Sequence, residues 1–119
     1  MYLSLRRRGA EIILAPSAFT MRTGLAHWDL LIRARALDSQ CYLVCAAQAG
    51  QHYNQRQSYG CSAVVSPWGE ILAQFGCDDG VSSAEGDCLF VEVDPRRVLT
   101  ARDRIPLEEH RKKPAFWTD

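Results

Sequence analysis

The amino-acid sequence predicts a protein that combines helices with a buried sheet, in the α/β or α+β class. Two short runs, Ile12 to Ala15 and Tyr42 to Ala47, are continuously apolar, which is typical of strands covered on both faces. The segment between them carries apolar residues at the spacing of an amphipathic helix. A strand, a helix and several further strands are therefore expected in that order.

The chain opens on the end of a helix. Leu3 and Leu5 precede a run of arginines, and Gly9 suits the left-handed position that follows many helices. Residues 10–15 form the first predicted strand. Pro16 ends that strand, because proline has no N–H to donate to a neighbouring strand.

A loop at residues 17–24 leads into a predicted helix from Leu25 to Ser39. The apolar residues on one side of this helix are Leu25, Trp28, Leu31, Ile32 and Ala36. Charged residues fall between these positions. The charged side is expected to face solvent or a partner.

A second apolar strand and a hairpin are expected in the middle of the chain. The strand is Cys41 to Gln48, and the polar stretch from Ala49 to Ser58 is predicted to be a loop. Tyr59 to Ser66 and Glu70 to Phe75 flank Pro67-Trp68-Gly69. Proline presets one backbone angle of such a turn and glycine permits another, so these segments are predicted to pair as a hairpin.

The last part of the chain is predicted to hold a loop, a strand and a helix. Residues 76–86 are rich in Gly, Ser and Asp, which favours a loop. Residues 88–93 resemble a short strand, and Pro95 suits the first turn of a helix that runs to about Arg104 and ends by Pro106. No repeat or low-complexity tract divides the 119 residues, so one domain or a piece of one is expected.

Charge and hydropathy exclude two classes of partner. Lys and Arg number 14 and Asp and Glu number 14, so the chain offers no basic field for a nucleic-acid backbone. The apolar runs are far shorter than the roughly 20 residues that span a bilayer. The N-terminal residues do not have the pattern of a secretory signal. A soluble protein is expected, cytoplasmic with a mitochondrial location as the alternative, and with neither nucleic acid nor membrane as partner.

The five cysteines are predicted to be structural thiols. An odd number without a Cys-x-x-Cys pair is typical neither of a disulfide framework nor of a ribbon-type zinc site. A reducing compartment is therefore favoured. Most of these cysteines lie in apolar surroundings, where a thiol acts as a small core residue. No metal and no cofactor is predicted.

Motifs of nucleophilic catalysis are weak in this sequence. Gly60 to Val64 lacks the second glycine of a serine-hydrolase elbow and continues into a strand. A Cys–His pair would need a cysteine beside His27, His52 or His110, and the sequence alone does not show whether any cysteine lies beside one of them in the fold. Cys61 is the best placed of the five, since it follows a glycine after a polar loop, and a structural thiol is the alternative reading. His27 could donate to a ligand or cap a local carbonyl group.

Long patterned runs carry a family resemblance. They are Gly9 to Thr20, Thr23 to Trp28, Arg33 to Tyr42, Ser58 to Gly60, Ser62 to Gly69, and Arg104 to Pro106 with His110 and Arg111. In this order they resemble the nitrilase superfamily of carbon–nitrogen hydrolases, in the stretch that follows the catalytic cysteine. Among its branches the chain looks most like the Nit proteins, amidases that act on deaminated glutathione, with omega-amidase a close second.

The resemblance implies a fold and an activity. The family has an α+β fold, a four-layer α-β-β-α sandwich, of which residues 1–119 would be the C-terminal portion. Its members hydrolyse small amides with a glutamate base, a lysine that stabilises the oxyanion and a cysteine that becomes acylated. All three precede the matched stretch, so no catalytic residue is assigned here. The chain by itself is predicted to be inactive, because it lacks these three residues. It is also predicted to fold poorly, because the cover of its apolar strands is missing.

The resemblance also implies a site and partners. One wall of the pocket for a small amide substrate is assigned to Ser17, Ala18, Phe19, Thr20, His27 and Trp28. Cys61 stands where close relatives usually have histidine. The family pairs through helices near the nucleophile and a C-terminal segment, so Leu25 to Ser39 and Arg104 to Trp117 are candidate homodimer contacts. The alternative is a non-catalytic module that dimerises with a full-length homologue.

Overall fold

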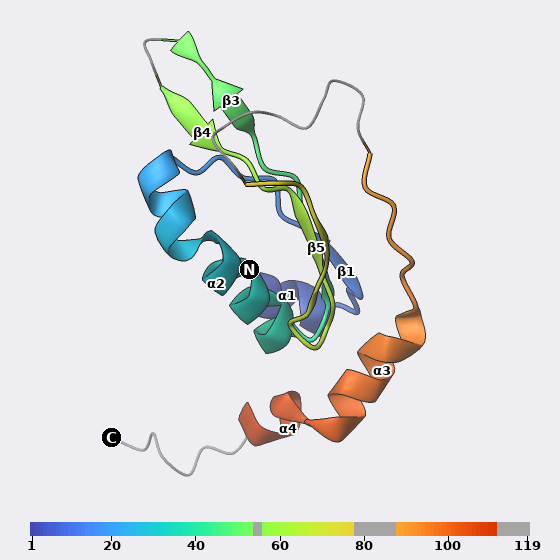
Figure 1. The fold of residues 1–119 in the computed structure, drawn as a ribbon. Coiled ribbons are helices and arrows are strands. Elements are labelled where there is room, and N and C mark those ends of the chain that lie inside the picture. The colour runs from blue at the N-terminus through green and yellow to red at the C-terminus, as the bar shows by residue number, and fades with distance from the viewer. Residues whose placement is uncertain (54–55, 78–87, 112–119) are drawn as a thin grey trace, which may run out of the picture.

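The structure, a computed structural model, describes residues 1–53, 56–77 and 88–111. It is an α+β fold in which α1 and α2 lie on one side of a four-stranded sheet (Figure 1). The helices are α1 (Tyr2–Arg7), α2 (Met21–Ser39), α3 (Pro95–Arg104) and α4 (Leu107–Arg111). The strands are β1 (Ile12–Leu14), β2 (Tyr42–Cys45), β3 (Ala49–Gln51), β4 (Gln57–Tyr59), β5 (Ala63–Val65) and β6 (Ile71–Gln74). No helix within the described ranges has the length and apolar character needed to cross a membrane.

The main sheet has the strand order β1-β2-β5-β6. β1 and β2 are parallel and α2 crosses between them, whereas β2, β5 and β6 pair antiparallel. The predicted hairpin is confirmed: Gly69 takes a φ of +81° and its N–H donates to the carbonyl of Ser66 over 2.9 Å. The predicted strands at 10–15 and 41–48 are confirmed as the shorter β1 and β2.

The helix α2 begins four residues before the predicted start at Leu25. Thr20 caps it, because its hydroxyl accepts from the N–H of Thr23 over 3.4 Å. Gln40 ends the helix in the left-handed conformation, with a φ of 50°. The start was missed because Thr20 lies within a run that reads as a loop.

Fewer apolar residues of α2 are buried than predicted. Trp28, Ile32 and Ala36 are buried as expected, but Leu25 and Leu31 are exposed. Leu31 lies at the edge of the strip that these three residues define, whereas Leu25 lies in line with it, near the start of the helix. Leu30 and Leu37 add two exposed leucines on the opposite side of the helix.

The strand β1 is covered on one face only, which corrects the expectation of cover on both. Ile13 is buried against the helices, while Ile12 and Leu14 are 47% and 71% exposed. Side chains alternate between the two faces of a strand, so Ile12 and Leu14 share the face that α1 and α2 do not reach. We call this the uncovered sheet face.

Two other segments differ from the prediction. Residues 49–58 are not a simple loop, because β3 and β4 pair as an antiparallel hairpin with Gly50 opposite Ser58. Most of its residues are polar, so no apolar alternation marked it. Residues 88–93 form no strand, since they make no ladder with a neighbour. The predicted loop at 76–86 lies largely outside the described residues.

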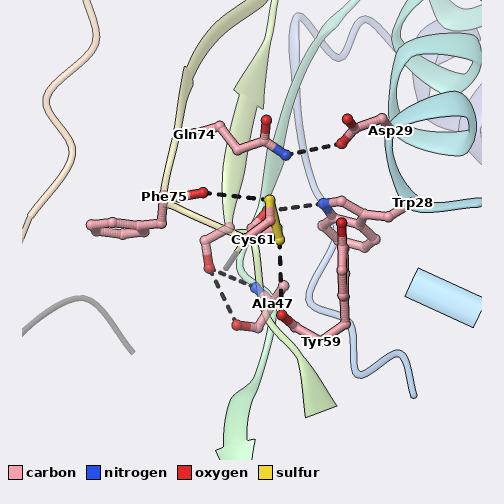
Figure 2. Close-up of a disulfide and its surroundings, with 9 residues drawn as sticks. Trp28, Asp29, Ala47, Tyr59, Cys61, Gln74 and Phe75 are labelled. Atoms are coloured by element: carbon pink, nitrogen blue, oxygen red, sulfur yellow. Dashed lines mark hydrogen bonds between the residues drawn. A yellow bond between two sulfur atoms is a disulfide. The ribbon is translucent and has the colours of Figure 1, made fainter. Parts of the chain in front are cut away.

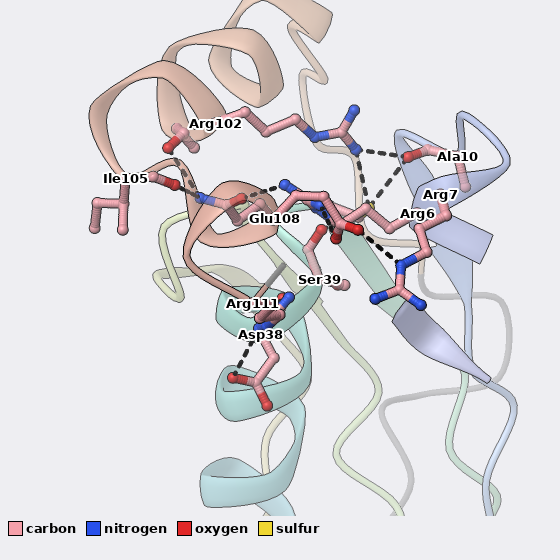
Figure 3. A network of polar contacts seen from close by, with 12 residues as sticks. Arg6, Arg7, Ala10, Asp38, Ser39, Arg102, Ile105, Glu108 and Arg111 are labelled. Carbon is pink, nitrogen blue, oxygen red and sulfur yellow. Dashed lines mark hydrogen bonds and ion pairs between the residues drawn. The ribbon is translucent and has the colours of Figure 1, made fainter. Parts of the chain in front are cut away.

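A polar network attaches the C-terminal helices to α1 (Figure 3). Arg6 is only 8% exposed and donates to Glu108 over 2.9 Å and to Gln40 over 2.7 Å. The side chain of Gln40 in turn donates to the carbonyl groups of Ala101 and Ile105. Helix α3, confirmed at its predicted bounds, and α4 are thereby fixed to the end of α2.

Candidate functional site

The loop after β1 is held in place by backbone pairing. Ser17 forms a parallel bridge with Ala47: its N–H donates to the carbonyl of Ala46 and its carbonyl accepts from Gln48, each over 2.9 Å. Farther along, the carbonyl of Phe19 accepts from the N–H of Tyr59 over 2.9 Å. The loop therefore continues the sheet and presents its side chains in fixed directions.

Two of the predicted site residues form a rigid aromatic pair. The rings of Phe19 and Trp28 meet edge to face with centroids 5.2 Å apart, a favoured arrangement for aromatic side chains. Trp28 is buried, and its indole N–H donates to the carbonyl of Cys61 over 2.9 Å (Figure 2). Trp28 thus fixes the position of Phe19 rather than offering its own N–H to a ligand.

A small pocket of about 150 Å³ lies beside this pair. It brings together Ser17, Phe19 and Trp28 of the predicted set. The other lining residues are Tyr2, Ala15, Leu31, Ile32, Arg35, Leu43 and Cys45. Pockets that enclose small molecules typically measure about 300–1,000 Å³, so this cavity is too small to enclose such a ligand by itself.

The remaining predicted site residues lie elsewhere. Ala18 is exposed and lines a second, open pocket of about 590 Å³ together with Gln48, His52, Tyr53, Arg56 and Ser58. Thr20 is exposed and its hydroxyl caps α2. His27 is exposed on α2 and lines neither of these two pockets. Sequence reasoning did not single out Gln48, which was predicted to end a strand, or Arg56 and Ser58, which were predicted to lie in a polar loop.

Two cysteines form a disulfide, contrary to the expectation of structural thiols only. Cys61 precedes β5 and Cys77 follows β6, and antiparallel pairing of these strands brings the two together with their Cα atoms 5.0 Å apart (Figure 2). The count and spacing of cysteines could not reveal this, because the hairpin creates the proximity. Cys41, Cys45 and Cys88 take no part in this disulfide.

The two buried cysteines outside the disulfide, Cys41 and Cys45, do not have the setting of a nucleophile. Burial raises the pKa of Cys45 from 9.0 to about 11, so its sulfur stays protonated at neutral pH. Cys41 is also buried, and its thiol donates to the carbonyl of Ala10. Over the same residues, no group of three or more His, Cys, Asp or Glu side chains could hold a metal ion.

Comparison with known proteins identifies a family and several relatives that this chain resembles. The carbon–nitrogen hydrolase family model matches residues 1–93. The NitFhit fusion protein of Caenorhabditis elegans is 49% identical over 111 residues, covering 93% of this chain and 24% of the relative. Human deaminated glutathione amidase is 46% identical over 114 residues, covering 96% of this chain and 33% of the relative. The chain thus spans between a quarter and a third of the length of these two relatives.

Solved structures agree with the sequence comparison. The crystal structure of C. elegans NitFhit superposes with a TM-score of 0.82 at 47% identity, over 98% of this chain and 26% of that one. Saccharomyces cerevisiae Nit3, of the nitrilase superfamily, superposes with a TM-score of 0.78 at 33% identity, over 94% of this chain and 39% of that one. The chain belongs to the carbon–nitrogen hydrolase family, within the nitrilase superfamily and close to its Nit-type amidases.

Proposed function

We propose that this chain is the C-terminal portion of an amidase that hydrolyses a small amide such as deaminated glutathione. The supporting observation is the aromatic wall of Phe19 and Trp28, held by the sheet beside the end of β1. Ligands of open α/β sheets bind at the carboxyl ends of strands, where this wall lies. Several relatives are deaminated glutathione amidases, the human protein among them, and this supports the choice of substrate.

The chemistry of the proposed reaction belongs to residues outside the chain. The family mechanism needs a glutamate base, an oxyanion-stabilising lysine and an acylated cysteine, and no residue here matches them. Loss of a general base alone costs roughly 10²–10⁴-fold in rate, and loss of the nucleophile removes the covalent route. The chain is therefore proposed to position the substrate and to have no amidase activity by itself.

A joined enzyme tests this proposal. Residues 1–119 replace the segment of human deaminated glutathione amidase that they match, so that the human protein supplies the missing residues. Hydrolysis of deaminated glutathione is expected for the joined enzyme and not for the 119-residue chain. A joined enzyme that folds, by circular dichroism, but releases no product would refute the proposal.

The aromatic wall can be tested in the same enzyme. Phe19→Ala should lower kcat/KM roughly tenfold or more, because a pocket wall displaced by about 1 Å misplaces the reacting groups. Phe90→Ala is the matched control, since Phe90 is exposed and lines neither pocket described above. Equal activity of the two variants would leave Phe19 without a role.

A second candidate function is supported by the outer side of α2. Leu30 is 71% exposed and Leu37 follows it two helical turns later, also exposed. Exposed leucines in one stripe of a helix are typical of a helix that packs against another chain. The chain would then act as a non-catalytic module that pairs with a second copy or with a full-length homologue. Co-purification with such a homologue would support this candidate.

A further inference from the structure

The β3–β4 hairpin builds a second surface beside the predicted wall. Thr20 and Ser58 form an antiparallel bridge, and the N–H of Tyr59 donates to the carbonyl of Phe19 over 2.9 Å. Through these contacts the hairpin is tied to the loop at residues 17–20. The open pocket of about 590 Å³ lies along this junction, with Ala18 on one side and His52 and Arg56 on the other.

The polar groups of this pocket suit an anion. Its lining residues include Arg56, which carries a guanidinium group, Gln48, which carries an amide, and His52, which carries an imidazole, and none of the described lining residues is Asp or Glu. Guanidinium groups bind carboxylates through two parallel hydrogen bonds, which favours a planar carboxylate over a point charge. A ligand with a free carboxylate is therefore the chemical class that matches the pocket.

His52 is positioned by a buried partner. Its Nε2 lies 2.8 Å from the hydroxyl oxygen of Ser58, and Ser58 is only 4% exposed. When the Ser58 hydroxyl donates to Nε2, the ring carries its hydrogen on Nδ1 and can donate from there. The contact thus orients the imidazole in a pocket that also holds the Arg56 guanidinium.

The same pair does not have the form of a catalytic dyad. A serine nucleophile needs a histidine that a third group orients, and it needs access to the substrate. Ser58 is buried within β4, and none of the pocket's other lining residues is a carboxylate that could orient His52. The geometry supports binding and not nucleophilic attack.

We propose that Arg56 and His52 bind a carboxylate of the amide substrate and so set the preference for anionic amides. This inference rests on the proposed amidase function. Deaminated glutathione carries carboxylates at its ends, and the pocket adjoins the loop that is expected to face the amide. Arg56 and His52 would contribute equally to the bound substrate and to the transition state, so their loss raises KM and leaves kcat unchanged.

The joined enzyme tests this inference with two substrates, deaminated glutathione and its methyl diester. Arg56→Gln is expected to raise KM for deaminated glutathione about tenfold, the change that roughly 1.4 kcal/mol produces, with kcat unchanged. KM for the methyl diester, which lacks the charges, is expected to be the same in both enzymes. Arg8→Gln is the matched control, because Arg8 is exposed at the end of α1 and does not line this pocket.

The outcomes separate this inference from the proposed function. An active joined enzyme in which Arg56→Gln leaves KM for the diacid unchanged overturns the carboxylate site alone. An equal rise in KM for diacid and diester also overturns it, because the effect would not depend on charge. An inactive joined enzyme refutes the amidase proposal. Calorimetric titration of the 119-residue chain with deaminated glutathione then decides the inference, which fails unless Arg56→Gln weakens binding.

Discussion

At the scale of single residues, Gly24 leaves the least room for a side chain among the glycines that the structure describes. A Cβ atom built there would lie 2.1 Å from Cγ of Tyr59, close to the backbone end of that side chain. These atoms of Tyr59 cannot move aside without shifting its backbone. Gly24→Ala should therefore destabilise the fold by about 1–3 kcal/mol, despite the better helix propensity of alanine. Urea denaturation would measure the loss. Gly76→Ala is the control, because nothing lies within 4 Å of its Cβ.

The cysteines outside the disulfide should differ in reactivity. Burial raises the pKa of the Cys45 thiol to about 11, whereas Cys88 is exposed. With iodoacetamide at pH 8, mass spectrometry should find Cys88 modified and Cys45 intact, because the thiolate is the reacting form. Modification of both at equal rates in the folded chain would contradict the burial of Cys45.

The raised pKa of Cys45 also fixes the sign of a pH effect on stability. The folded state holds this proton more tightly than the unfolded state, whose thiol keeps a pKa near 9.0. The contribution is therefore complete below pH 9 and is lost as the pH rises from about 9 to about 11. Cys45→Ala should remove this part of the alkaline loss of stability.

At the scale of elements, α4 is attached chiefly through Glu108. Its carboxylate accepts from Arg6 and Arg7, each over 2.9 Å, and Arg6 is buried (Figure 3). Glu108→Gln should cost about 1.5–3 kcal/mol, the range for hydrogen bonds to charged groups. Thermal unfolding measures the change. Glu109→Gln removes an exposed charge on the same helix and should have little effect, and equal losses for the two would contradict the network.

Elements with strong local signals could be predicted from the sequence. Gly9, Pro16, Pro95 and the Pro67-Trp68-Gly69 turn each impose a backbone geometry, and the helices and the hairpin beside them are where the sequence places them. The β3–β4 hairpin carries no such signal. It pairs through backbone groups of polar residues, so its side chains do not alternate between apolar and polar, and the pocket that it builds could not be foreseen.

The residues of the candidate site also divide into those that local sequence indicates and those that only tertiary pairing brings together. Ser17, Phe19 and Trp28 converge on one pocket because they flank one strand end and the following helix, which a sequence can indicate. His52, Arg56 and Ser58 join Ala18 only through tertiary pairing between distant segments. The Cys61–Cys77 disulfide depends on tertiary pairing too, since it needs the register of β5 with β6.

At the scale of the whole molecule, two apolar surfaces remain without cover in the described structure. One is the uncovered sheet face, with Ile12 and Leu14. The other is the outer side of α2, with Leu30 and Leu37. The first matches the position where a sandwich would receive its second sheet, and the second matches a helix-to-helix contact. Substitutions on the two surfaces should therefore have different effects.

Leu30→Lys and Leu14→Lys distinguish these surfaces. If α2 pairs with a second copy, Leu30→Lys should convert a dimer into a monomer in sedimentation velocity, because it places a charge in the middle of the contact. Leu14→Lys should leave the dimer intact and instead reduce the binding of the dye ANS, which reports exposed apolar surface. Both leucines are 71% exposed, so neither substitution should lower the free energy of unfolding by more than about 0.5 kcal/mol. A chain that stays dimeric with Leu30→Lys but dissociates with Leu14→Lys would place the interface on the sheet and not on α2.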